Sequence, residues 1–308
     1  MDPIAFEIKA LHLQIHWYGI CMALSMLIGA WLAARLLKSH GRNGDTVWDG
    51  LFVIILSGII GARIVYVLTN LSQYFGDQMN PWDIFAVWKG GLSFHGGIIF
   101  GMIASWLFFR AQRIPFVEVM DSFAPGVSIG IILVRIGNFL NGDIEGYKWD
   151  GPWAMNFKYD VLHMADQNAV ILRHPTELYG LLVGVFCLVA SLILWNETYR
   201  TKRFATGTTF FGFIITYSLV RSVIEEPFRN VPLLWKVVDP ATAGYGLFTT
   251  TQLASIVLII VAIWGLTQVR KWERNRSLAP APPPPPIKPE GKSRQVQRAV
   301  QREKQKGK

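Results

Sequence analysis

LYGLLVGVFCLVASLILWN, residues 178–196, is a run of 19 residues that contains no Asp, Glu, Lys or Arg. The hydrocarbon core of a bilayer is about 30 Å thick, and about 20 apolar residues in a helix span it. This stretch therefore predicts a transmembrane helix. Further apolar runs of similar length occur at residues 17–37, 51–70, 91–110, 116–137, 206–224 and 247–268. The sequence predicts an all-α polytopic membrane protein with about seven transmembrane helices.

The overall composition agrees with this fold class. Hydrophobic residues make up 51% of the 308 residues and charged residues 17%, where soluble domains carry about 25% charged residues. The 12 Trp and 19 Phe add more apolar surface than a water-soluble shell could cover. Both cysteines, Cys21 and Cys187, lie inside apolar runs, which excludes a disulfide framework.

The net charge of +9 is confined to one end of the chain. Residues 270–308 contain 12 Lys or Arg and 3 Glu, so residues 1–269 are neutral. This distribution excludes a basic, nucleic-acid-binding body. We expect a membrane domain over residues 1–269 and a basic cytoplasmic tail over residues 270–308. The proline run 279–286 predicts an extended spacer, and the Lys-, Arg- and Gln-rich end beyond it predicts disorder.

Basic residues in short loops indicate the orientation, because Lys and Arg accumulate on the cytoplasmic side. The loops after the first, third and fifth runs hold the pairs and triplets Lys38/Arg42, Arg110/Arg113 and Arg200/Lys202/Arg203. We therefore expect the N-terminus outside and the C-terminus inside. The polar segment 138–176 is too hydrophilic to span and predicts a small insert that faces outward.

Several polar side chains fall at one predicted depth, near the headgroups of the outer leaflet. They are Tyr18, His95, Arg135, Glu177, Arg221, Glu225 and Glu226. Arg63 lies somewhat deeper. Ionisable groups in spans are unfavourable and are functional candidates by default. Paired arginines suit a phosphate, and histidine supplies a base near neutral pH. The pattern predicts a site for a phospholipid headgroup.

One motif adds a family resemblance. VRIGNFLNGDIEG, residues 134–146, closely resembles the signature of bacterial prolipoprotein diacylglyceryl transferases, usually G-R-[IL]-G-N-F-[IL]-N-G-E-x-x-G. Matching segments follow the order of that family and cover about residues 10–270: HWYG (16–19), SFHGG (93–97), HPTELY (174–179), Tyr217 with Arg221, and Gln252. The chain departs from the usual pattern at Val134, Asp143 and Tyr147.

The resemblance implies a reaction and its partners. The family moves the diacylglyceryl group of phosphatidylglycerol to the lipobox cysteine thiol of a preprolipoprotein, and releases glycerol 1-phosphate. This is the first step of lipoprotein maturation. The partners implied are phosphatidylglycerol, the lipobox and signal peptide, and membrane lipid, in the bacterial cytoplasmic (inner) membrane with the site facing the outer leaflet. No cofactor, metal or nucleic acid is expected. The functional positions of the family carry over as Tyr18, His95, Arg135, Asn138, Gly146 and Arg221.

Roles for these side chains follow from their chemistry. Arg135 and Arg221 would stabilise the departing phosphate, and His95 would deprotonate the thiol. In an alternative assignment Arg221 activates the thiol and His95 assists the phosphate. Gly142 and Gly146 would permit tight turns. The full set of expected substrate-binding residues is Tyr18, Arg135, Asn138, Asn141, Gly142, Gly146, Tyr217, Glu225, Glu226 and Arg229. Either Glu225 or Glu226 would pair with Arg229.

Two other classes of membrane protein also have several spans with buried charges: an anion or lipid transporter and a retinal receptor. An anion or lipid transporter could use Arg135 and Arg221 as a headgroup site, but it predicts a repeat between the two halves of the chain. No repeat is visible, since the polar insert divides the runs into four and three. A seven-helix retinal receptor needs a lysine in the last helix, and residues 241–269 contain none.

The predicted topology can be tested with single-cysteine variants at Lys158 and Arg274. An impermeant thiol reagent added from outside should label the probe at position 158, in the insert, and leave the probe at position 274 unlabelled. Labelling at position 274, or none at position 158, would refute the orientation.

Overall fold

A computed structural model describes residues 3–8, 13–74, 80–87, 90–142, 146–156, 171–235 and 237–278. Part of the predicted insert, including Asp143 and the labelling position Lys158, lies outside these residues. So does the proline-rich tail beyond Leu278. The first of two units into which the chain divides ends at Lys271.

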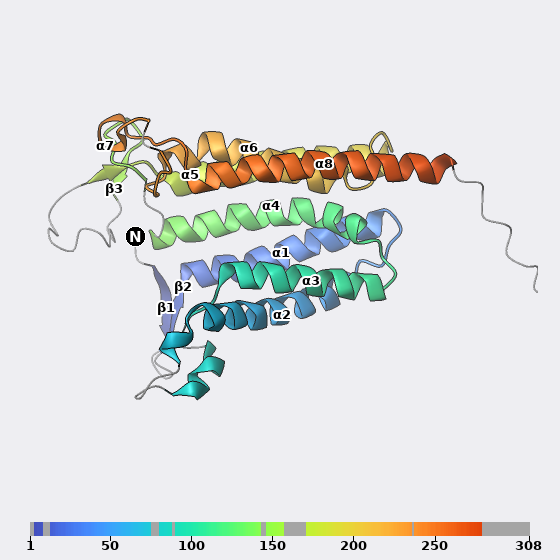
Figure 1. The fold of residues 1–308 in the computed structure, drawn as a ribbon, viewed down its shortest axis with the longest axis horizontal. Helices are drawn as coiled ribbons and strands as arrows, with labels where there is room; N and C mark the ends of the chain where they lie inside the picture. Colours follow the sequence, from blue (N-terminus) through green and yellow to red (C-terminus); the bar gives the residue numbers. More distant parts are fainter. Residues whose placement is uncertain are drawn as a thin grey trace, which may run out of the picture. The chain divides into compact units, whose positions relative to one another are not determined.

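Each of the seven predicted apolar runs is a helix (Figure 1). The helices are α1 (Trp17–Ser39), α2 (Thr46–Thr69), α3 (Phe94–Ala111), α4 (Phe116–Asn141), α5 (Thr176–Trp195), α6 (Thr208–Ile224) and α8 (Thr250–Leu278). Six of them are long and apolar enough to cross a membrane. The seventh, α6, has 17 residues, or about 26 Å, which is near the lower limit for a span. The predicted all-α polytopic membrane fold is confirmed.

The remaining elements are short and lie between or before these helices. An antiparallel hairpin, β1 (Ile4–Ile8) and β2 (Leu13–His16), precedes α1. Short 3-10 helices η2 (Leu71–Gln73) and η3 (Pro81–Phe85) lie between α2 and α3. The insert contains β3 (Met155–Asn156) paired with β4 (Leu172–Arg173). The other elements are η6 (Asn196–Arg200), η7 (Glu226–Phe228) and α7 (Pro240–Ala243).

Helix α4 is central to the packing, because it contacts α1, α5 and α6, while α2 pairs mainly with α3. In Figure 1, α3 and α1 begin, and α4 and α6 end, at the same end of the helices. We call this the site end. The sequence placed the end of the fourth helix at residue 137, but α4 continues through Asn141, so Asn138 and Asn141 belong to its last turns.

The charged residue Asp121 is accommodated inside α4 by contacts with other helices. Its side chain is fully buried, and its carboxylate accepts hydrogen bonds from the backbone N–H of Gly207 (2.6 Å) and Phe210 (2.8 Å). The Tyr199 hydroxyl donates a third bond of 2.8 Å. The first N–H groups of a helix have no partner within the helix. Asp121 therefore caps α6 from a neighbouring helix, at the end opposite to the site.

Helices α1 and α4 touch through their backbones. A methyl group added at Gly29 would lie 2.9 Å from the carbonyl oxygen of Gly126, and one added at Gly126 would collide with the carbonyl oxygen of Gly29. Small residues at such crossings let helices approach closely, and van der Waals contact stabilises helix pairs in lipid. This contact holds the backbones of α1 and α4 directly against each other.

Gly126→Ala should therefore destabilise the protein by about 1–3 kcal/mol, because two rigid backbones must separate. Unfolding of the purified protein in detergent measures the effect. Gly130→Ala is the matched control, since its added methyl group would meet only the Ser25 Cβ at 3.9 Å, an ordinary contact. Equal stability of the two variants would contradict the account of the crossing.

Candidate functional site

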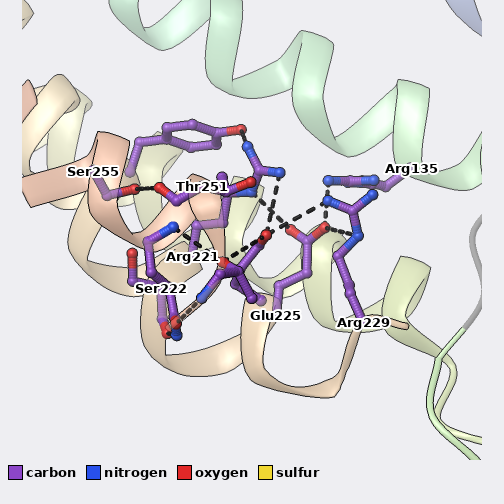
Figure 2. A network of polar contacts seen from close by, with 11 residues as sticks. Arg135, Arg221, Ser222, Glu225, Arg229, Thr251 and Ser255 are labelled. Carbon is purple, nitrogen blue, oxygen red and sulfur yellow. Dashed lines mark hydrogen bonds and ion pairs between the residues drawn. The ribbon is translucent and has the colours of Figure 1, made fainter. Parts of the chain in front are cut away.

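Five charged side chains from α4, α6 and the turn after α6 come together at the site end. We call them the arginine–glutamate cluster: Arg135, Arg221, Glu225, Glu226 and Arg229. Figure 2 shows Arg135 from α4 pointing toward the residues that close α6. Helix α6 ends at Ile224, and η7 turns the chain directly after it. This change of direction lets both adjacent glutamates face the arginines.

Glu225 lies among all three arginines. Its side chain is 1% exposed, and its Oε1 is 2.5 Å from Arg135 Nη2. The same oxygen is 3.9 Å from Arg229 Nε, and Oε2 is 3.8 Å from Arg221 Nε. A buried carboxylate is stable only when it is paired. Glu225 therefore holds the arginines of α4 and α6 around one carboxylate.

Glu226 provides a second buried carboxylate for two of the arginines. Its Oε2 is 3.3 Å from Arg221 Nη2 and 3.5 Å from Arg229 Nη1. Its Oε1 accepts a hydrogen bond of 3.2 Å from the Thr249 hydroxyl. The sequence left open whether Glu225 or Glu226 pairs with Arg229. Arg229 lies within ion-pair distance of both.

The cluster has an excess of one positive charge, because three guanidinium groups meet two carboxylates. The arginine side chains are 13–21% exposed, whereas both glutamates are almost fully buried. Within the described residues, the Nε groups of Arg221 and Arg229 donate no hydrogen bond. These two Nε groups are buried, so it is the partly exposed remainder of the arginine side chains, with the excess positive charge, that suits a further anionic group.

Side chains of α6 and α8 form hydrogen bonds to the cluster and to the residues next to it. The Arg221 Nη1 group donates a 2.9 Å hydrogen bond to the Tyr217 hydroxyl. Gln252 Nε2 donates to the Ser222 carbonyl at 3.0 Å, and Gln252 Oε1 accepts from the Thr249 N–H at 3.1 Å. The sequence identified Tyr217 and Gln252 but not Thr249. The polar run Thr249–Gln252 before an apolar helix was its only signal.

Gly180, on α5, is a second residue that the sequence did not identify. A methyl group at this position would collide with Arg135 Nε and would lie 3.0 Å from Glu225 Oε2. The Arg135–Glu225 pair thus occupies the space that a side chain at residue 180 would fill. A glycine inside an apolar helix has no chemical signal, so only the packing identifies it.

The motif residues of α4 lie beside α1. A methyl group on Gly137 would lie 3.2 Å from the Tyr18 Cα, so Tyr18 is next to the turn that bears Asn138. The Asn138 carbonyl accepts a 2.7 Å hydrogen bond from the Gly142 N–H. Gly142 caps α4 with a φ of 72°, a left-handed conformation that favours glycine. The predicted turn at Gly142 is present.

Gly146 does not form the tight turn that the sequence predicts; a glycine is needed there because another backbone segment passes close to it. Its φ is not among the positive values found in the described glycines. An added methyl group would collide with the His174 carbonyl oxygen, and Gly146 forms an isolated β-bridge with Arg229. Its own carbonyl accepts a 3.1 Å bond from Arg173 Nη1. Gly146 therefore lets the insert pass close to the turn that carries Arg229.

An aromatic group in the insert covers the same turn. The His174 ring stacks on Trp149 at 4.3 Å and lies 4.8 Å from Phe228. His174 Nδ1 is 2.9 Å from the Tyr179 hydroxyl. Burial lowers the pKa of the His174 imidazole below its usual value, so the neutral ring is favoured. His174 is a packing residue of the insert.

His95 stands apart from the cluster. It lies in the first turn of α3 and is exposed. In the described part of the chain, no hydrogen bond or ion pair joins it to the arginines. It shares the site end with them (Figure 1). Glu177, the other candidate at this depth, is fully buried at the start of α5.

An apolar cavity of about 300 Å³ lies between α6, α8 and the segment before α8. Its walls include Leu219, Leu234, Trp235, Phe248, Leu253 and Ile256. Ser222, Thr249 and Gln252 also line it, and Thr249 binds Glu226 directly. The cavity therefore adjoins the arginine–glutamate cluster. Charged donors next to an apolar space suit a ligand with an anionic head and an apolar tail.

Among the described residues, no group of three or more His, Cys, Asp or Glu side chains could hold a metal ion. That no metal takes part stays a prediction.

The apolar helices define a polytopic membrane protein, and the positively charged cluster at the site end is its candidate site for an anionic ligand. Comparison with known families matches residues 3–268 to the family described as prolipoprotein diacylglyceryl transferase. The chain belongs to this family, and it is a transferase. The transporter alternative is not favoured.

Curated relatives agree with this assignment. The chain is similar to proteins named phosphatidylglycerol–prolipoprotein diacylglyceryl transferase. One, from Thermus thermophilus, is 36% identical over 281 residues, covering 86% of this chain and 98% of the relative. Another, from Legionella pneumophila strain Paris, is 35% identical over 267 residues, covering 86% and 95%.

Removal of Glu225 tests the importance of the buried pair. Glu225→Ala should lower the free energy of unfolding by about 3–5 kcal/mol, because Arg135 loses its buried partner. Glu197→Ala is the control. Its carboxylate pairs with exposed groups, Arg203 at 3.9 Å with a side chain that is 77% exposed and the Thr201 hydroxyl at 3.1 Å, so the loss should stay below about 1 kcal/mol. Denaturation in mixed micelles measures both, and equal losses would contradict the central role of Glu225.

Proposed function

We propose that this protein transfers the diacylglyceryl group of phosphatidylglycerol to the lipobox cysteine thiol of a preprolipoprotein. Family membership supports the reaction, and the names of the relatives specify both substrates. The observation that carries the proposal for the site is the arginine–glutamate cluster. The protein would act in the bacterial inner membrane, with the site end facing the outer leaflet.

The bond changes define what the site has to do. The thiol sulfur forms a bond to the carbon of the diacylglyceryl group that carries the phosphate. The bond from that carbon to the phosphate oxygen breaks. The thiol proton passes to a base, and glycerol 1-phosphate leaves with the electron pair of the broken bond. Negative charge therefore grows on the phosphate. Fixed donors directed at developing charge lower the barrier of such reactions.

Arg135 and Arg221 are the proposed donors for this phosphate. Each is held by a carboxylate, at 2.5 Å for Arg135 Nη2 to Glu225 and at 3.3 Å for Arg221 Nη2 to Glu226. The carboxylates fix the orientation of both guanidinium groups before the lipid arrives. The net positive charge of the cluster favours the anionic headgroup. Arg229 adds a third cation at the same place.

His95 is the proposed base for the thiol. The free thiol has a pKa of about 8.5, so it needs help to ionise near neutral pH. Arginine stays protonated in proteins, which makes Arg221 a poor acceptor of that proton. His95 is exposed at the site end. Tyr18 and Asn138 lie on the neighbouring helices α1 and α4 and would orient the glycerol by hydrogen bonds.

The apolar cavity beside the cluster is the proposed place for part of one acyl chain of the lipid. An acyl chain between α6 and α8 would keep its apolar surroundings while the headgroup meets the arginines. The signal peptide would reach the same end of the helices, with its lipobox cysteine at headgroup depth. The basic tail beyond residue 269 would lie on the opposite side of the membrane, away from the reaction.

Transfer from phosphatidylglycerol to a lipobox peptide by the purified protein tests the proposal. Arg135→Ala and Arg221→Ala should each lower the transfer rate by about 10²–10³-fold, because one donor to the phosphate is lost. Lysine at either position should restore only part of the rate, since an ammonium lacks the planar pair of donors. Full activity of Arg221→Ala would remove that residue from the site.

Arg110→Ala serves as the matched control for both variants. Arg110 is also a helical arginine near a span end, but it is exposed at the other end of α3, and its described contact is with the Trp106 ring. Its substitution should leave the transfer rate unchanged. Absence of thioether formation by the unmodified protein, combined with movement of an anionic lipid or anion across vesicles, would support a transporter instead.

A further inference from the structure

Arg63, on α2, carries a buried charge that the proposed reaction does not use. Its side chain is 7% exposed, although it lies in a predicted span. Such residues are functional candidates by default. Its surroundings are not those of a substrate ligand, because its guanidinium group is occupied by the backbone of the segment that leads into α3.

The guanidinium of Arg63 makes four hydrogen bonds to backbone carbonyls. Nη2 donates to Asp83 (2.5 Å) and Nε to Ile84 (2.8 Å). Nη1 donates to Gly90 (2.6 Å) and Gly91 (2.8 Å). Both edges of the planar group are thus satisfied, which lysine could not reproduce. The rings of Tyr66 and Tyr74 lie 5.8 and 5.5 Å from the guanidinium carbon.

The last of the carbonyls that bind Arg63 belongs to Gly91, four residues before His95. Directly after Gly91, the Ser93 N–H donates a 2.9 Å bond to the carbonyl of Ala62, the neighbour of Arg63. The Ser93 hydroxyl then caps α3 by accepting from the Gly96 N–H at 3.3 Å. A methyl group on Gly96 would lie 2.5 Å from the Gly61 carbonyl oxygen. The first turn of α3 is therefore fastened to the turn of α2 that bears Arg63.

We propose that Arg63 is a positioning residue, whose four backbone hydrogen bonds hold the start of α3 so that His95 is placed for the transfer reaction. The inference rests on the role proposed above for His95. It assigns Arg63 no contact with the lipid phosphate, which is left to Arg135 and Arg221 on other helices.

Two adjacent glycines offer a test variant and a matched control. The test variant disturbs the surroundings of the Arg63 guanidinium without removing Arg63. Gly90 and Gly91 have φ values of 84° and 75°, so alanine strains the backbone at either position. An added methyl group at Gly91 would lie 2.9 Å from Arg63 Nη1 and 2.5 Å from Tyr66 Cε1. At Gly90 it would meet nothing within 4 Å. Of the two, only the methyl group of Gly91→Ala would press on the Arg63 guanidinium and on the Tyr66 ring beside it.

The experiment measures kcat and KM for phosphatidylglycerol, with a lipobox peptide as acceptor, for the unmodified protein and for Gly90→Ala, Gly91→Ala, Arg63→Lys and His95→Gln. We expect Gly91→Ala and Arg63→Lys to lower kcat by about tenfold or more relative to Gly90→Ala, because small displacements of a reacting group have large effects. KM should change by no more than about twofold, since the phosphate ligands are untouched. Gly91→Ala should unfold at a somewhat lower temperature than Gly90→Ala, because its added methyl group meets Arg63 and Tyr66, so kcat is measured well below both unfolding temperatures.

Each contrary result has a distinct meaning. Equal kcat for Gly91→Ala and Gly90→Ala, with His95→Gln inactive, would overturn the inference and leave the role of His95 intact. A raised KM with unchanged kcat in Arg63→Lys would make Arg63 a lipid ligand and also overturn it. Full transfer by His95→Gln would refute the base proposed above, and the inference with it. If Arg63→Lys does not fold, the two glycine variants still decide.

Discussion

The burial of two adjacent glutamates among three arginines is the interaction on which the site depends. Glu225 and Glu226 are each 1% exposed, and a buried carboxylate is stable only when it is paired. The arginines in turn come from α4, α6 and the turn after α6. The carboxylates therefore join elements that apolar packing alone would leave free to shift. The same groups that hold the helices together also leave a positive excess where the proposed phosphate must bind.

The insert and the start of α8 are arranged around this cluster. Gly146 bridges to Arg229, and the Tyr147 N–H donates a 2.9 Å bond to the Phe228 carbonyl. Thr249 reaches Glu226 from the other side. Helix α3 is separate from these contacts, because it packs mainly on α2. The proposed phosphate ligands and the proposed base are thus supported by different parts of the fold.

The helices were predictable because runs such as residues 178–196 contain no charge. Arg135 and Arg221 could be selected because charged residues at one predicted depth are unusual. The partner of Arg229 could not be predicted, since the spacings of Glu225 and Glu226 both fit and only the turn at Ile224 brings both into reach. Gly180 acts through the space it leaves, which has no signature in one sequence. Gly146 was selected from the motif, but the close approach of the His174 carbonyl that requires a glycine there could not be predicted. Arg63 was visible as a charge, but its carbonyl partners lie 20–28 residues away in the chain.

Helix α6 is attached to α4 at both of its ends. At one end the Asp121 carboxylate binds the N–H groups of Gly207 and Phe210, and at the other Arg135 binds Glu225. Sliding of α6 along α4 would break one attachment or the other. The pair is thus a spacer of constant length, about 26 Å over the 17 residues of α6. Bilayers of different thickness would change how deeply the arginines sit in the lipid, while the distances within the cluster stay the same.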